Sequence, residues 1–163
     1  MNYDETPPLK RLYLNPYKII LRNKIMKGFA DFSNGNYQTL LKLYAENVHQ
    51  YLEGNHALSG ERFSKAKVEL WFQRFVRLLP SKFLIKDMII QGGPWNTVVI
   101  MEFQDTVSPE GVPTYKNNGI MKATVKWGKT TDVHIYVNTA KVEKALATLT
   151  QNGVEEAAAP PIE

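Results

Sequence analysis

The sequence predicts an α+β fold, with helices in the first half of the chain and a mostly antiparallel sheet in the second. Apolar residues recur at helical spacing over 17–33 and 64–79. Beyond Pro80 they alternate with polar residues, and residues 115–138 have the pattern of a long hairpin. Helices and strands are therefore segregated along the chain, which is typical of α+β rather than α/β proteins. A chain of 163 residues is expected to form one domain with its own core.

The composition indicates a globular protein without thiol chemistry. The formal net charge of +4 is small, so we expect no nucleic-acid partner. The absence of cysteine excludes disulfides, catalytic thiols and thiolate metal sites. No apolar run is long enough to span a membrane, and the N-terminal segment MNYDETPPLK lacks the apolar core of a secretory signal. We therefore expect a soluble cytoplasmic protein with no membrane partner.

An arm and three helices are predicted before the sheet. Residues 1–16 contain adjacent prolines and are expected to form an irregular arm. A helix is predicted over 17–33, and a short one over 37–45. Ser64 can cap a third helix that ends near Leu79, before a proline. The apolar stripe of this helix is wide, as in a helix that packs on a sheet. Its members are Val68, Trp71, Phe72, Phe75 and Leu79.

Strands, one further helix and a tail account for the rest of the chain. A short strand is predicted over 48–53, and longer ones over 83–91 and 95–104. A loop should follow over 105–113 and lead into the hairpin. A helix over 142–149 ends the domain, which spans residues 17–150. Residues 151–163 are expected to be a flexible tail.

The hairpin centres on Gly128-Lys129, which we predict to be a two-residue type II′ turn because that turn prefers glycine first. In this register His134 lies opposite Ala123. One face then carries Tyr115, Asn117, Gly119, Met121, Ala123, Val125, Asp132, His134, Tyr136 and Asn138. The other face includes Ile120, Val133, Ile135 and Val137.

The two faces lead to different expectations. The first mixes polar, aromatic and small side chains, as the wall of a small-molecule cavity does. An ordinary half-buried sheet with a polar end is the structural alternative. On the second face Ile120, Val133, Ile135 and Val137 are apolar and lie beside Thr124 and Thr131, so we expect a homodimer through this side of the sheet.

His134 is the first choice for a proton-transfer residue, since histidine titrates near physiological pH. Asp132, on the same predicted face, could orient the imidazole. The structural alternatives are a histidine hydrogen-bonded within the sheet and a solvated aspartate. Three histidines without a dense carboxylate cluster lead us to expect no metal site.

Further residues are candidates for ligand binding. Four are hydrogen-bonding groups on the predicted cavity wall: Tyr115, Asn117, Tyr136 and Asn138. Buried tyrosines can instead simply satisfy the core. His56 lies in a glycine-bounded loop, either at the cavity mouth or on the surface. Trp71 and Phe75 either line the cavity or belong to the core.

Several segments resemble the SnoaL-like polyketide cyclases and ketosteroid isomerases, which share the nuclear transport factor 2-like fold. DFSNGNYQTLLKLYAENV over 31–48 is similar to the helix-pair opening of that group, and LSGERFSKAKVELWFQRF over 58–75 to its basic helix with Trp-Phe. GGPWNTVVI and TYKNNGIMKATVKWGKTTDVHIYVNT resemble its long strands. The resemblance covers roughly residues 17–150. It implies a cone of three N-terminal helices on a strongly curved sheet, with an internal pocket.

The resemblance also implies proton transfer near a carbonyl group, without a cofactor. This sequence has Asn138 where many SnoaL-like sequences have Asp, and an amide cannot act as a base. Two functions are compatible with these residues. One is a cofactor-independent isomerase or cyclase acting on a small hydrophobic carbonyl compound. The other is a non-catalytic ligand-binding or dimeric assembly module on the same fold.

Overall fold

The computed structural model describes residues 15–163, so most of the expected N-terminal arm lies outside the described residues. The elements occur in the following order: α1 (Pro16–Phe32), α2 (Gln38–Leu41), β1 (Tyr44–Leu52), β2 (Gly60–Arg62), α3 (Lys65–Leu78), β3 (Ser81–Gly93), β4 (Asn96–Val107), β5 (Tyr115–Lys126), β6 (Lys129–Val137), α4 (Thr139–Gln151) and the 3-10 helix η2 (Glu155–Ala158). No helix within 15–163 has both the length and the apolar character needed to cross a bilayer.

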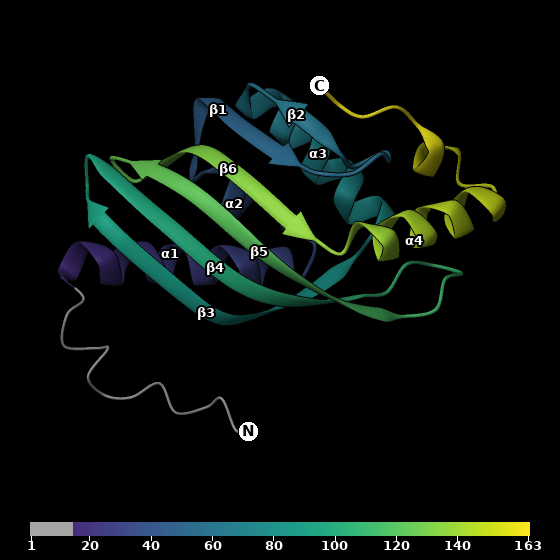
Figure 1. Cartoon of the computed structure of the whole chain (residues 1–163), viewed down its shortest axis with the longest axis horizontal. Helices are drawn as coiled ribbons and strands as arrows, with labels where there is room; N and C mark the ends of the chain where they lie inside the picture. Colours follow the sequence, from purple (N-terminus) through teal and green to yellow (C-terminus); the bar gives the residue numbers. More distant parts are fainter. Residues whose placement is uncertain (1–14) are drawn as a thin grey trace.

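The strands form one open sheet in the order β2-β1-β6-β5-β4-β3. Neighbouring strands are antiparallel, except that β1 and β6 run parallel. Helices α1, α2 and α3 lie behind this sheet in Figure 1, and α4 lies beyond the end of β6. The expected α+β class with a mostly antiparallel sheet is confirmed.

Capping residues set where the long helices begin. The Asn15 side chain accepts a hydrogen bond from the Lys18 backbone N–H at 2.9 Å, and Pro16 occupies the first turn of α1. Ser64 caps α3 in the same way, as predicted. The second helix is shorter than predicted because β1 already begins at Tyr44, where pairing with β6 replaces local helix propensity.

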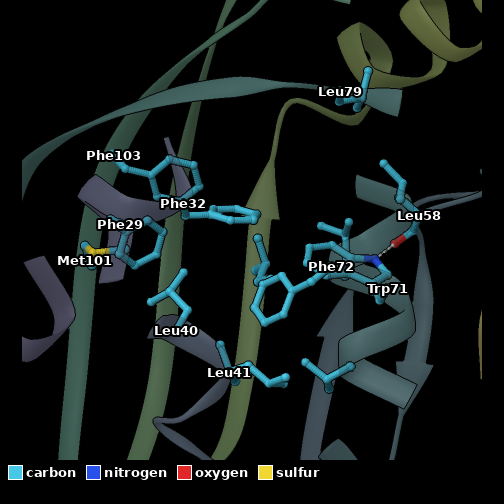
Figure 2. Close-up of a cluster of buried hydrophobic side chains, with 14 of the residues drawn as sticks. Phe29, Phe32, Leu40, Leu41, Leu58, Trp71, Phe72, Leu79, Met101 and Phe103 are labelled. Carbon is cyan, nitrogen blue, oxygen red and sulfur yellow. Dashed lines mark hydrogen bonds between the residues drawn. The ribbon is translucent and has the colours of Figure 1, made fainter. Parts of the chain in front are cut away.

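Aromatic rings fill much of the space between the helices and the sheet (Figure 2). The ring of Phe32 lies 5.3 Å from that of Phe72 and 5.4 Å from that of Phe83. The indole N–H of Trp71 donates to the Leu58 carbonyl oxygen at 2.7 Å, so its one polar atom is satisfied. Burying each such ring contributes roughly 1.5–3 kcal/mol. The helices are therefore held on the sheet mainly by aromatic packing.

The C-terminal segment, expected to be a flexible tail over 151–163, packs on the domain instead. Glu156 in η2 accepts a hydrogen bond from Arg77 at 2.6 Å. The Pro160 carbonyl oxygen accepts one from Arg74 at 2.8 Å. The fully buried Arg62 donates to the carbonyl oxygen of Ile162 at 3.4 Å. The composition of the tail did not reveal these partners, because the arginines come from distant elements.

The hairpin turn lies one residue earlier than predicted. Lys126 pairs with Lys129, so the turn residues are Trp127 and Gly128. Both have positive φ, 52° and 76°, which identifies a type I′ rather than a type II′ turn. This difference alone shifts the pairing by two residues and keeps each side chain on its expected face.

A β-bulge in β6 changes the faces. Val125 pairs with Thr130, whereas Thr124 pairs with Asp132, so Thr131 is an extra residue in β6. Beyond it, His134 lies opposite Lys122 instead of Ala123. The predicted register is therefore wrong by one residue over most of β6.

This correction exchanges the two predicted faces of β6. Val133 and Ile135 are buried, with exposed fractions of 1% and 6%, and do not form an outer apolar face. Tyr136 is 45% exposed on the outer face, opposite Ile120. Of the apolar residues proposed for a dimer contact, only Ile120 lies on the outer face, and the homodimer stays a prediction.

Replacing Trp127 with Asn should stabilise the protein by roughly 0.5–1 kcal/mol. Asparagine tolerates positive φ better than tryptophan, and Trp127 is exposed, so little packing is lost. Thermal unfolding of the two proteins measures the change. Trp127→Val is the matched control and should destabilise, because a β-branched residue disfavours this conformation. Equal melting temperatures for the Asn and Val variants would contradict the assigned turn.

Candidate functional site

A small cavity lies between the aromatic core and the inner face of the sheet. Its volume is about 60 Å³. Most of its wall is apolar and comes from α1, α3 and the strands. The polar residues of the wall are Tyr44, Gln50, Asp105, Tyr115 and Asn117. A cavity of this size holds a few water molecules or a compact ligand, since drug-sized ligands occupy about 300–1,000 Å³.

Asp105 is the one acidic residue among those that line the cavity. It lies on β4 opposite Asn117, on the inner face that also carries Met101 and Phe103. Burial raises the pKa of its carboxyl group to about 6, whereas nearby Ser81 and Lys141 act in the opposite direction. Within residues 15–163 its Oδ1 atom has no hydrogen-bond partner. Asp105 is therefore a carboxyl group that can gain or lose a proton near neutral pH.

Tyr115 and Gln50 contribute further polar atoms without partners. The Tyr115 hydroxyl is buried and forms no hydrogen bond with the described part of the chain. Burial, and then the charge of Asp105, raise the pKa of this hydroxyl, so it stays protonated and can donate. Both side-chain amide atoms of Gln50 are likewise buried without a partner in the described chain. A buried polar group left unpaired costs about 1–3 kcal/mol, so these groups favour water or a polar ligand in the cavity.

The structure brings four of the sequence-predicted ligand residues to this cavity: Trp71, Phe75, Tyr115 and Asn117. The Asn117 amide is already engaged. Its oxygen accepts from the backbone N–H groups of Asn118 and Asn138, and its nitrogen donates to the Asn138 carbonyl oxygen at 3.4 Å. Asn117 therefore links the beginning of β5 to the N-cap of α4, and Tyr115 has the freer hydrogen-bonding group.

Two predicted ligand residues, Asn138 and His56, instead form hydrogen bonds with nearby backbone N–H groups. Asn138 is the N-cap of α4, where its side-chain oxygen accepts from the Lys141 N–H at 3.4 Å. A capping role suits an asparagine at this position. His56 lies in the loop before β2, and its Nδ1 accepts from the Leu58 N–H at 3.2 Å. Burial lowers the pKa of His56. Neither residue lines the aromatic cavity.

The three remaining candidates lie on the outer face of the sheet. The bulge in β6 points Asp132, His134 and Tyr136 away from the cavity, which corrects the expectation that they share a wall with Tyr115. His49 of β1 joins them, and its Nδ1 lies 2.8 Å from Asp132 Oδ1. Nitrogen and carboxylate donors at such distances could hold a metal ion.

Sequence reasoning missed Asp105 and Gln50. Asp105 was assigned to the start of a loop, but it continues the alternation of Val99, Met101 and Phe103, which would have placed it on the same face. On β1, Gln50 follows Val48 by two residues and therefore lies on the same face, and both side chains are fully buried. A polar residue in phase with an apolar face was thus the available signal.

Comparisons with known proteins find similarity in structure. No family model matches the sequence, and no curated protein matches it. A nuclear transport factor 2-like protein from Burkholderia pseudomallei aligns with a TM-score of 0.67 at 10% identity, over 77% of this chain and 95% of that one. TerC, co-crystallized with polyporic acid, aligns with a TM-score of 0.66 at 16% identity, over 77% and 96%.

Proteins related to ketosteroid isomerase by fold also match. A protein of this kind from Catenulispora acidiphila, in complex with trimethylamine, aligns with a TM-score of 0.58 at 14% identity, over 69% of this chain and 83% of that one. Structures of proteins proposed to be polyketide cyclases match as well. These similarities agree with the element order and strand topology described above. The chain therefore has the nuclear transport factor 2-like fold that ketosteroid isomerase-like proteins and these cyclases share.

Proposed function

We propose that the protein binds a compact carbonyl compound in the aromatic cavity and moves a proton next to the carbonyl group. Asp105 is the base that takes a proton from the carbon beside the carbonyl. The Tyr115 hydroxyl donates a hydrogen bond to the oxygen, where negative charge develops in the enolate. Asp105 then returns the proton: at the same carbon this only exchanges the hydrogen, whereas at the γ-carbon of a β,γ-unsaturated carbonyl compound it moves the double bond, in both cases without a cofactor.

The supporting observation is a pair of buried oxygens in one apolar cavity, Asp105 Oδ1 and the Tyr115 hydroxyl, which have no hydrogen-bond partner within residues 15–163. A base works best when its pKa lies near the working pH, and burial gives Asp105 a pKa of about 6. The raised pKa of Tyr115 keeps its hydroxyl a donor. The location of Asp105 favours it over His134 as the base, because His134 lies on the opposite face of the sheet.

The volume of the aromatic cavity limits the size of the ligand. About 60 Å³ accommodates a compact molecule, and a larger one would require the aromatic wall to move. Phe32, Phe72 and Phe75 provide flat apolar surfaces to such a ligand. A relative of this fold holds trimethylamine, which is a very small molecule, and another was co-crystallized with polyporic acid. These two examples support a small-molecule role for this chain as well.

A second candidate function is assembly through the outer face of the sheet. Four partly exposed apolar or aromatic residues cross β3 to β6: Ile89, Ile100, Ile120 and Tyr136. Ile89 pairs with Ile100, and Ile120 pairs with Tyr136. The two pairs are offset, because Ile100 lies opposite Lys122 and Ile120 lies opposite Glu102. Two apolar pairs on one face of the sheet favour a second copy of the chain as the partner, because an isologous contact buries each pair twice.

Replacing Asp105 with Asn should raise stability at pH 7.5 and leave it nearly unchanged at pH 4. The folded pKa is raised from 3.8 to about 6, so protonation favours the folded state and stability is lost as pH rises through this window. The loss amounts to at most about 3 kcal/mol. Denaturant unfolding at several pH values measures it. Asp87→Asn, at an exposed site, is the control and should show no such pH-dependent gain. A pH-independent difference for the Asp105 variant would argue against a buried, titrating carboxyl.

Hydrogen–deuterium exchange of a compact ketone such as cyclopentanone tests the proposed chemistry. The protein should accelerate exchange beside the carbonyl, with a rate that rises through pH 6 as Asp105 loses its proton. Asp105→Asn should lower the rate roughly 100-fold or more, and Tyr115→Phe by a similar factor. Asp87→Asn should match the native protein. Ketone binding, seen as a higher melting temperature, without faster exchange in the native protein would reduce the protein to a binding module. Faster exchange that is unchanged in Asp105→Asn would remove Asp105 from the mechanism.

Sedimentation at micromolar concentration tests the second candidate. The native chain should sediment as a dimer, and Ile120→Lys should shift it toward monomer, because the lysine replaces one apolar member of the pair formed by Ile120 and Tyr136 with a charge. Val154→Lys, at a partly exposed apolar site near the C-terminus, is the matched control and should stay dimeric. A native protein that is monomeric in this range would reject assembly through this face.

A further inference from the structure

We propose that the outer face of the sheet binds a zinc ion through His49, Asp132 and His134. Each residue offers one ligand atom, and these atoms all lie within 4.8 Å of one another. The histidines are far apart in the sequence, which is why their spacing predicted no metal site. The fold brings them together through the parallel pairing of β1 with β6.

The backbone fixes the positions of all three residues. His49 lies directly opposite Asp132 in the parallel pair, and His134 follows two residues later on the same face of β6. Both strands are interior to the sheet, since β2 flanks β1 and β5 flanks β6. Sites on such rigid elements keep their geometry better than sites on loops.

The distances are close to those of a tetrahedral zinc site. Zinc lies about 2.0–2.1 Å from nitrogen and 2.0–2.2 Å from carboxylate oxygen, which separates neighbouring ligand atoms by roughly 3.3 Å. Asp132 Oδ1 lies 2.8 Å from His49 Nδ1 and 3.5 Å from His134 Nε2. Small side-chain rotations therefore suffice to bring the three donors around one ion.

Acceptors lie near the other ring nitrogen of each histidine. The Nδ1 of His134 is 3.4 Å from the Tyr136 hydroxyl. The Nε2 of His49 is buried without a hydrogen-bond partner in the described chain, and Glu61 Oε2 lies 3.7 Å away, just beyond hydrogen-bond distance. Histidines that bind metals almost always donate their second N–H to an acceptor, and a small shift of the Glu61 side chain would supply one to His49. Phe63 stacks on His49 at 4.9 Å and restrains it further.

The donor set selects the kind of ion. Two imidazoles and one carboxylate suit zinc, whereas magnesium and calcium prefer oxygen ligands throughout. The same donors also accept ferrous iron, but more weakly. The side chains are about one-third exposed, so a fourth position faces solvent and can hold water. Lys122 lies opposite His134 and is also a cation. Because Lys122 is exposed, solvent and salt screen its repulsion of a metal ion.

Calorimetric titration of the full chain, without a polyhistidine tag, with Zn²⁺ alone tests the proposal. One ion should bind per chain with micromolar or tighter affinity, and Mg²⁺ should not bind. His49→Gln and His134→Gln should each weaken zinc binding at least 100-fold, and Glu61→Gln by roughly 10- to 100-fold. Competition with Fe²⁺ should favour zinc. Cobalt added in place of zinc should give the visible absorption of a four-coordinate ion.

His56→Gln is the matched control, because it removes the third histidine of the chain and leaves the cluster intact. Circular dichroism and melting temperature should show that each variant folds without metal. If a histidine variant does not fold, Asp132→Asn removes the carboxylate ligand with little change in shape. Native zinc affinity weaker than millimolar, unchanged binding in the cluster variants, or an equal loss in His56→Gln would overturn the proposal.

Discussion

The β-bulge at Thr131 is the constraint on which both candidate sites depend. Side chains alternate along a strand, so one extra residue exchanges the faces of everything beyond it. The bulge turns Val133 and Ile135 toward the helices, where they complete the core. It turns Asp132 and His134 outward, toward His49. Without this extra residue the His134 imidazole would face the cavity, and the outer cluster would lose two of its donors.

Aromatic packing determines what kind of cavity the interior can offer. Phe32, Phe72 and Phe83 hold the helices on the sheet and leave little space between them. Within that space the Asp105 carboxyl and the Tyr115 phenol have oxygens without a partner in the described part of the chain, although satisfied or apolar groups would stabilise the fold more. Groups that lower stability in this way are typical of functional sites, where activity limits how stable a protein can become.

Periodicity was sufficient to predict the α+β class, the capped third helix and the inner position of Tyr115. It would also have placed Asp105 inside, had the strand been extended by one alternation. The bulge could not be predicted, because Gly128 belongs to the hairpin turn and residues 129–132 contain no glycine that would signal an extra residue. The meeting of His49 with His134 depends on a long-range parallel pairing, which local patterns do not encode.

The two candidate sites share strands but not faces, and this makes their chemistry separable. On β1, His49 faces outward and Gln50 inward; on β6, His134 faces outward and Ile135 inward. A substitution at an outward position leaves the inner wall unchanged, because neighbouring side chains on a strand project to opposite sides. β6 is paired on both sides, with β1 and with β5, and β1 is paired with β6 over residues 49–52, so this backbone resists the shift that would transmit a change from one site to the other. The sheet therefore acts as a rigid partition, and each face can be tested independently of the other.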